Sequence, residues 1–309
     1  MLSLLRPRIA NTRVGLEFRA DGLAIAVARP ARYLNLKHVE CFWLPSLPNK
    51  RIVNLSQAID RLGLKGCNCD IVLPRNEYQR LEIDKPNVPD DELTGAARWA
   101  VRKVLDQPDS DFQVEYFDYP EQALRGRPPR INVRVVQQDS LNTALQSAKA
   151  AGLKPVRVTV SDLAVKNLMQ QVLESQDLQL LVKYEKGYGL ILIQKGGVLY
   201  FCRDFYLQKR SNPGSEEALQ TLAIEIQRSI DYFEGQTGIA TPKLIHCLSD
   251  LAAERQTALS SLLGYSIRPF PYQGNLGELD SLSDASSGAL LSVQSALASL
   301  CVSQGEGVS

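Results

Sequence analysis

Residues 14–27 read Val-Gly-Leu-Glu-Phe-Arg-Ala-Asp-Gly-Leu-Ala-Ile-Ala-Val, and this stretch predicts a β-hairpin. Val14–Phe18 and Leu23–Val27 are apolar runs of strand length, and the turn Arg19–Gly22 between them ends in Asp-Gly. Asp-Gly is a strong hairpin signal because both residues tolerate the backbone angles that a tight turn requires. A further apolar run at Lys37–Leu44 predicts a third strand. The chain therefore opens with three antiparallel strands.

The same order returns in the second half of the chain. Leu180–Tyr184, Gly189–Ile193 and Val198–Arg203 predict three more strands, joined by glycine-containing turns. In the first half a helix at Leu55–Leu62 and a buried strand at Cys69–Leu73 follow the opening strands. The second half continues through a long helix, a strand and another helix. The apolar residues of that long helix recur at helical spacing and are Leu219, Leu222, Ala223, Ile226, Ile230 and Phe233.

Three strands followed by helix and strand, twice over, are typical of the actin-like ATPase (ribonuclease H-like) fold. We therefore predict an α/β protein of this fold, with two duplicated α/β domains. A small β-α-β-β subdomain is expected as an insertion in the first domain, at about residues 78–137. Its helix is predicted to begin at the acidic run Asp90-Asp91-Glu92, which suits the positive end of a helix dipole. We predict an N-terminal tail at residues 1–12, a first domain at 13–176, a second domain at 177–302 and a C-terminal tail at 303–309.

Composition excludes several classes of protein. The chain has 309 residues, enough for two domains at roughly 150 residues each. Its 35 basic and 34 acidic residues give a net charge of +1, which argues against a large nucleic-acid interface. No apolar run approaches the roughly 20 residues of a membrane span. We expect a cytoplasmic protein, although Leu2, Leu4, Leu5 and Arg6 leave a weak amphipathic membrane contact open.

Metal and disulfide chemistry are not expected. Among the six cysteines only Cys67 and Cys69 are closely spaced, and one intervening residue is not the usual zinc spacing. His38 and His246 are isolated in the sequence. Reduced thiols in a reducing compartment explain the cysteines best.

Several short motifs, in this order, resemble the type IV pilus PilM proteins and, more narrowly, the MshI proteins of mannose-sensitive haemagglutinin (MSHA) pilus biogenesis. The most specific is Glu225–Phe233, which is similar to the family's "EI-x-RS-x-D-Y" helix. The resemblance extends over roughly residues 14–300. The other positions that carry it are Val14–Glu17, Leu73-Pro74, Arg80, Pro86, Glu92-Leu93, Trp99, Ala150–Pro155 and Ser161-Asp162.

The resemblance implies an actin-like protein, related to the division protein FtsA, that is peripheral at the inner membrane. Its implied partner is a PilN-like bitopic protein whose short cytoplasmic tail is bound beside the inserted subdomain. A pilus assembly ATPase is a further implied partner. Carried over to this sequence, the groove would include Leu73, Tyr78, Arg80 and Trp99, with Trp99 also packing the subdomain onto its neighbour.

The first predicted phosphate hairpin departs from the family's pattern. A phosphate hairpin needs glycine and small hydroxyl residues, because backbone N–H groups must approach the phosphates closely. Here Arg19 stands where PilM-like sequences have glycine, and Asp21 stands where they usually have serine or threonine. Glu17 replaces an aspartate that would hold the hydrated metal.

The second hairpin departs further. Lys183 occupies the acidic position, and Glu185 occupies the glycine position, where its carboxylate would repel a triphosphate. The family's adenosine loop would fall at His246–Asp250, which contains no glycine. No other catalytic motif is visible. We therefore predict a non-catalytic adaptor of the pilus assembly platform, with a degenerate nucleotide site, no bound ATP or metal, and no enzymatic activity.

Two alternatives remain open from the sequence. One is an ATP-binding enzyme or filament of the actin class, in which Arg19 and Lys183 would bind phosphate by charge. The other is a cytoplasmic component like the type II secretion GspL proteins, ranked lower because those continue into a membrane helix. Arg125, Arg127 and Arg130 form a basic turn. We expect a solvated loop there, with contact to acidic lipid or an acidic partner as the alternative.

Overall fold

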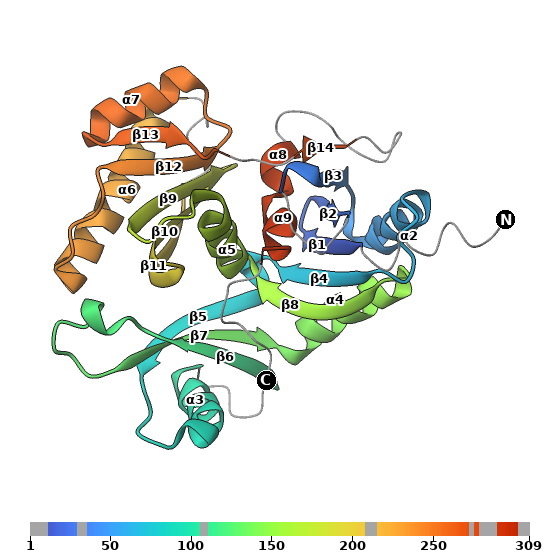
Figure 1. Ribbon diagram of the computed structural model, residues 1–309, viewed down its shortest axis with the longest axis horizontal. Helices are drawn as coiled ribbons and strands as arrows, with labels where there is room; N and C mark the ends of the chain where they lie inside the picture. Colours follow the sequence, from blue (N-terminus) through green and yellow to red (C-terminus); the bar gives the residue numbers. More distant parts are fainter. Residues whose placement is uncertain are drawn as a thin grey trace. The chain divides into compact units, whose positions relative to one another are not determined.

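The computed structural model (Figure 1) describes residues 12–29, 36–105, 111–207, 215–271, 275–277 and 289–301. The predicted tails and the amphipathic contact at residues 2–6 lie outside this part of the chain. Contacts divide the protein into two compact units. Unit 1 comprises Met1–Asp118, Arg130–Leu168 and Gly274–Ser309, and unit 2 comprises Tyr119–Pro129 and Met169–Gln273. None of the helices in the described ranges is long and apolar enough to cross a membrane.

Unit 1 is built on a six-stranded sheet in the order β14-β3-β2-β1-β4-β8. The three predicted opening strands are confirmed: β1, β2 and β3 pair antiparallel, whereas β4 and β8 continue the sheet in parallel. β14 adds a short parallel edge strand that the sequence did not predict. The strand bounds are β1 Arg13–Arg19, β2 Gly22–Ala28, β3 Val39–Pro45, β4 Asn68–Leu73, β8 Lys154–Val160 and β14 Asn275–Leu276.

The two faces of this sheet carry different side chains. On one face, branched apolar residues such as Leu16 and Ile25 pack with helices α2 (Arg51–Arg61) and α4 (Gln138–Ala150). The other face has small residues on β1 and β2, and helix α9 (Gln294–Ser299) packs against β1, β2 and β4.

Gly15 is required where α9 meets the sheet. A Cβ atom at this position would lie 2.0 Å from the carbonyl oxygen of Ala296, far inside any allowed contact. The preceding helix α8 (Ala289–Ser292) is separated from α9 at Val293. Gly288–Leu300 is apolar enough to predict one continuous helix, in the second domain, whereas the structure has two short helices in unit 1.

A buried ion pair lies on β4 of the same sheet. Asp70 is fully buried, with Oδ2 2.6 Å from Arg13 Nε and Oδ1 3.4 Å from Arg157 Nε. Asp70 and Arg157 are register partners on the parallel strands β4 and β8. Arg157 also donates to the backbone carbonyl of Ser299, so one guanidinium contacts both the aspartate and α9.

The inserted subdomain follows β4 and has the predicted β-α-β-β order. Its sheet, β5-β7-β6, is antiparallel, and helix α3 packs on it through Ala97 and Val101. The bounds are β5 Tyr78–Asp84, α3 Asp90–Leu105, β6 Phe112–Asp118 and β7 Arg130–Gln137. Between β6 and β7 the chain enters unit 2 as a short 3-10 turn, η4 (Glu121–Ala123).

Unit 2 has a five-stranded sheet in the order β11-β10-β9-β12-β13. The three predicted antiparallel strands are confirmed, and helix α5 (Ser161–Leu173) precedes them in the chain. The long predicted helix is α6 (Glu216–Thr237), and Gly238 caps its C-terminal end. The remaining bounds are β9 Leu178–Glu185, β10 Tyr188–Lys195, β11 Val198–Tyr206, β12 Leu244–Ser249, α7 Ala253–Leu263 and β13 Ser266–Pro269.

The basic turn of the insertion is exposed, as predicted for a solvated loop, and two of its arginines also donate hydrogen bonds to α6. Arg127 donates to the side chain and the carbonyl of Gln236, at 2.6 and 2.9 Å, and Arg125 donates to the carbonyl of Gly235. These groups lie in the last turn of α6, where the helix dipole favours cations. Arg130 pairs with Glu82 in the subdomain sheet. All three arginines therefore make polar contacts with other residues of the protein.

Candidate functional site

The first hairpin holds its charged residues close to its own turn. Glu17 is buried on β1, and Arg19 is the last residue of β1, paired with Gly22 across the turn. Arg19 Nε lies 3.4 Å from Asp21 Oδ1, and the guanidinium lies 5.5 Å from the ring centroid of Trp43. The side chain of Arg19 thus contacts the turn and an aromatic ring, at a position where the family pattern has glycine and no side chain.

The second hairpin has a buried ion pair. Lys183 and Glu185 are both about 5% exposed, and Lys183 Nζ lies 3.9 Å from Glu185 Oε2. Lys186 and Gly187 form the turn, with φ of +50° and +84°. Tyr184, between the two charged residues, points to the opposite face and packs in the core with α6.

Strand register makes the two hairpins directly comparable. Arg19 pairs with Gly22 and Glu185 pairs with Tyr188, so each is the last residue before a two-residue turn. Arg19 therefore corresponds to Glu185, and Glu17, two residues earlier, corresponds to Lys183. The charge order is reversed between the hairpins, and both depart from the glycine that a phosphate hairpin needs.

A second charge cluster lies at the start of α5. Asp162 is fully buried, with Oδ2 2.9 Å from Arg134 Nη2 and 3.6 Å from Arg80 Nη1. The backbone N–H of Asp162 donates to the hydroxyl of Tyr78, which also lies 3.2 Å from Ser161 Oγ. A carboxylate that already has two guanidinium partners is poorly suited to hold a hydrated metal ion.

This cluster contains two of the four residues that the sequence assigned to the partner groove. Tyr78 is 4% exposed, and the side chain of Arg80 is 11% exposed and ion-paired. Leu73 is also buried, in the core of the six-stranded sheet. Arg134 was not predicted from the sequence, where a charged residue within the strand Ile131–Val136 was the available signal.

Trp99 lies in a different place, on the outer surface of α3. It is 61% exposed, so the expectation that it packs the subdomain onto its neighbour is wrong. Lys103 Nζ lies 3.5 Å from the centroid of its ring. The buried side of α3 is formed by Leu93, Ala97 and Val101, one residue in four, and Trp99 is off that stripe.

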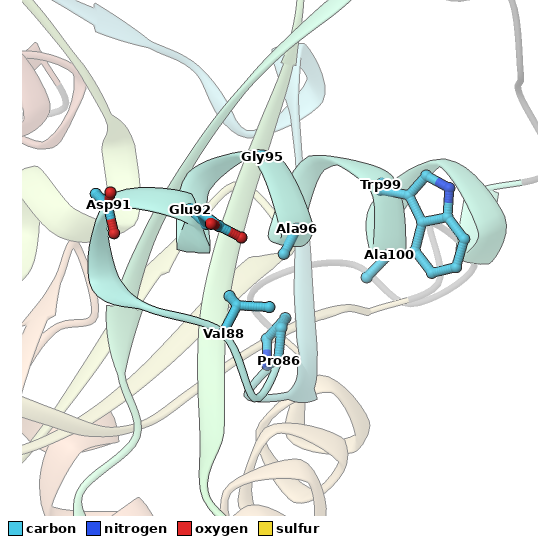
Figure 2. Close-up of a pocket in the computed structure, with 8 residues that line it drawn as sticks. All are labelled: Pro86, Val88, Asp91, Glu92, Gly95, Ala96, Trp99 and Ala100. Carbon is cyan, nitrogen blue, oxygen red and sulfur yellow. The ribbon is translucent and has the colours of Figure 1, made fainter.

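An open hollow of about 680 Å³ adjoins Trp99 (Figure 2). Pro86 and Val88 lie beside the helix, opposite Ala96 and Ala100, and the acidic side chains lie toward the end opposite Trp99. We call this surface the α3 groove. It is lined by Pro86, Val88, Asp91, Glu92, Gly95, Ala96, Trp99 and Ala100.

The α3 groove has the chemistry of a docking surface for a peptide. Gly95 faces open space, so nothing within the fold requires a glycine there, and glycine within a helix costs about 1 kcal/mol relative to alanine. Small residues at the base of a groove allow another backbone to approach closely. Exposed aromatic residues are frequent anchors of protein interfaces. The acidic end favours a partner that carries a cation.

Reactive thiols and metal clusters do not add a second candidate site. Burial raises the pKa of Cys69 and Cys301 to about 12 and that of Cys247 to about 11, so these thiols are protonated at neutral pH. Within the described ranges, no group of three or more His, Cys, Asp or Glu side chains could hold a metal ion.

Comparison with solved structures identifies the fold. The chain is similar to a chain of the PilM-PilN type IV pilus biogenesis complex, with a TM-score of 0.66 and 17% identity over 93% of this chain and 98% of that chain. It is also similar to a Bacteroides thetaiotaomicron protein with an actin-like ATPase fold, with a TM-score of 0.52 and 9% identity over 94% and 99% of the two chains.

The cytoplasmic domain of EpsL, from the type II secretion system of Vibrio cholerae, gives a TM-score of 0.49 at 13% identity, over 93% of this chain and 94% of that chain. That likeness is too low to decide between a pilus and a secretion system. No protein-family model matches the sequence, and neither does any curated protein. The chain has the actin-like ATPase fold, as the duplicated strand order predicted.

Proposed function

We propose that this protein is a non-catalytic adaptor of a type IV pilus assembly platform of the MSHA type, peripheral at the inner membrane on its cytoplasmic side. In this role it binds the cytoplasmic tail of a PilN-like bitopic protein. The observation that carries the proposal is the structural likeness to a chain of the PilM-PilN complex over nearly the full length of both chains. The short motifs quoted above, such as Glu225–Phe233, support the same role.

The charge arrangement supports a role without ATP turnover. Arg80 and Arg134 already bind Asp162, and each hairpin carries its own cation and its own carboxylate near the turn. Backbone approach to a phosphate is blocked where Arg19 and Glu185 replace glycine. The expected result of titrating the protein with Mg-ATP in a calorimeter is no heat of binding and no thermal stabilisation. Micromolar affinity would contradict this part of the proposal and favour a nucleotide-controlled switch.

The α3 groove is the proposed docking surface for the tail. Of the four groove residues predicted from sequence, only Trp99 is exposed, and it borders the hollow described above. A tail segment would place an apolar side chain between Val88 and Trp99 and a cationic side chain near Asp91 and Glu92. Its backbone would pass over Gly95, where no side chain interferes.

Binding of a labelled peptide of the PilN-like tail to the full chain tests this proposal. Trp99→Ala should weaken binding by about tenfold or more, as for an interface anchor. Gly95→Leu should abolish binding by filling the groove, and its Cβ meets nothing in the folded protein. Val104→Ala is the matched control, because Val104 is also exposed on α3 but lies outside the groove.

The two levels of the proposal fail in different ways. If the unaltered protein does not bind the tail peptide, the adaptor function itself is contradicted. If it binds and both Trp99→Ala and Gly95→Leu bind equally well, the function stands and the docking surface lies elsewhere. Thermal unfolding of each variant checks that lost binding does not reflect lost structure.

A further inference from the structure

A second exposed apolar surface lies at the start of helix α2, in unit 1. Leu47, Ile52 and Val53 are 65%, 47% and 57% exposed, although they fall within seven consecutive residues. Lys50 is exposed between them in the sequence. We call these four residues the α2 patch.

Hydrogen bonds hold the backbone that presents the α2 patch. Asn54 Nδ2 donates to Ser46 Oγ at 2.9 Å, and the N–H of Lys50 donates to the carbonyl of Leu47 at 3.0 Å. Arg51 donates from Nη2 to the carbonyl of Ala20 at 3.0 Å, which ties the helix to the first hairpin. The apolar side chains are therefore directed to solvent by an ordered turn.

Helix α2 does not need these side chains for its own packing. Its buried positions are Leu55, Ala58 and Ile59, which face the core of the six-stranded sheet. Ile52 and Val53 precede this stripe and remain exposed. Exposed branched residues on the first turn of a helix bring no stability to the folded chain, so a contact with something outside the chain is the simplest use for them.

The charged residues of α2 and its flanking segments are predominantly basic, and Asp21 of the first hairpin, whose carbonyl accepts from the N–H of Ser46, is a neighbouring carboxylate. No aspartate or glutamate occurs from residue 41 to residue 59. Residues 47–65 contain one acidic residue, Asp60, and its carboxylate is 2.6 Å from Lys65 Nζ. The four cations of this segment are Lys50, Arg51, Arg61 and Lys65.

We propose that the α2 patch contacts the surface of an anionic lipid bilayer. Leu47, Ile52 and Val53 would enter the boundary between headgroups and acyl chains, and the surrounding cations would lie among the anionic headgroups. Basic side chains near such a surface strengthen the attachment, and weak single signals of this kind give reversible binding. The inference goes beyond the adaptor proposal, because it gives the protein a direct contact with lipid.

Charge distinguishes the α2 patch from the α3 groove. The groove has Asp91 and Glu92 in its lining, which an anionic bilayer would repel, whereas the α2 patch has no acidic member. The three apolar side chains of the α2 patch are all exposed. A bilayer surface that offers both anionic headgroups and apolar chains complements the α2 patch.

Flotation of the full chain with lipid vesicles tests the inference. The protein should float with vesicles of phosphatidylcholine and phosphatidylglycerol, and much less with phosphatidylcholine alone. The double variant Ile52→Ser, Val53→Ser and the single variant Lys50→Glu should each bind about tenfold more weakly. Ile224→Ser is the matched control, because Ile224 is 50% exposed on α6 and lies outside the patch.

Two results would overturn the inference. One is that the unaltered protein does not bind anionic vesicles, or binds neutral ones equally well. The other is that the Ile52, Val53 variant binds as tightly as the Ile224 control. Thermal unfolding of all variants should coincide, because the altered side chains are exposed. A loss of tail-peptide binding in the α2 variants, without vesicle binding, would instead assign the patch to a protein interface.

Discussion

The two three-stranded openings, β1–β3 in unit 1 and β9–β11 in unit 2, share a register but differ in every charged position near their turns. Glu17 and Arg19 in the first correspond to Lys183 and Glu185 in the second. The common strand order survives this difference because the apolar residues on the helix-covered face are maintained in both sheets. Topology therefore constrains the core face strongly and the charged positions weakly.

The same correspondence extends to the next two strands. Gly15 pairs with Asp70 on β4, and at the matching place Leu181 pairs with His246 on β12. Asp70 pairs in turn with Arg157, and His246 pairs with Arg268. An arginine thus stands beside a carboxylate in unit 1 and beside an imidazole in unit 2. The first arrangement is an ion pair, whereas the second favours a neutral ring.

The largest loss in the free energy of unfolding is expected from removing the carboxylate of Asp70 in unit 1. Asp70→Ala leaves Arg13 and Arg157 without their buried counter-charge, and loss of one partner of a buried pair costs about 3–5 kcal/mol. Urea unfolding followed by circular dichroism measures this cost. His246→Ala is the matched control at the corresponding place, and it should cost clearly less. Equal losses in the two variants would contradict the comparison.

The hairpin ion pairs should differ in the opposite direction, with the larger loss of stability in unit 2. Lys183→Met removes a cation beside the buried carboxylate of Glu185, and we expect a loss of about 3 kcal/mol. Arg19→Met removes a cation whose partner Asp21 is 43% exposed, and such pairs contribute about 1 kcal/mol or less. Chemical unfolding of both variants tests the difference. If Arg19→Met is the more damaging, its contact with Trp43 outweighs burial of the second pair.

The smallest effect on folding stability is expected from the protonation of His246 as the pH falls. Burial, and secondarily the charge of Arg268, lower its pKa below the usual 6.5. The unfolded chain therefore takes up a proton more readily than the folded chain as the pH falls through this value. The contribution of neutral His246 to stability is present above pH 6.5 and is lost at lower pH.

His246→Gln should accordingly reduce the fall in stability between pH 7.5 and pH 5.5, measured by urea unfolding at each pH. His38→Gln provides the control, because His38 is exposed on η1 (Leu36–His38). An unchanged pH dependence in His246→Gln would show that other groups account for the acid sensitivity.

Sequence patterns predicted what depends on neighbours along the chain. Asp21-Gly22 gave the first hairpin, and the apolar spacing from Leu219 to Phe233 gave helix α6, although not its full length. β13 and β14 were missed because strands of four and two residues carry too little pattern. β13 forms by pairing with β12, and β14 forms by pairing with β3, so both depend on the folded sheet.

The candidate site was less predictable, because its contacts join distant parts of the sequence. The bonds from Arg127 to Gln236 span 109 residues, so a basic turn gave no sign that it caps a helix. Tyr78 and Arg80 looked available for a partner, yet both contact the start of α5. The exposure of Trp99 could have been predicted from the sequence. Leu93, Ala97 and Val101 recur every four residues on the buried side of the helix, and Trp99 does not lie on that side.

The packing of α9 against Gly15 has a consequence for how the protein is made. β1 precedes unit 2 in the chain, whereas helix α9, which covers it, follows unit 2. Until residues 289–301 emerge, the small-residue face around Ala24 and Ala26 has no cover, and Arg157 lacks its contact with Ser299. Unit 1 therefore completes its core only after synthesis has passed through unit 2.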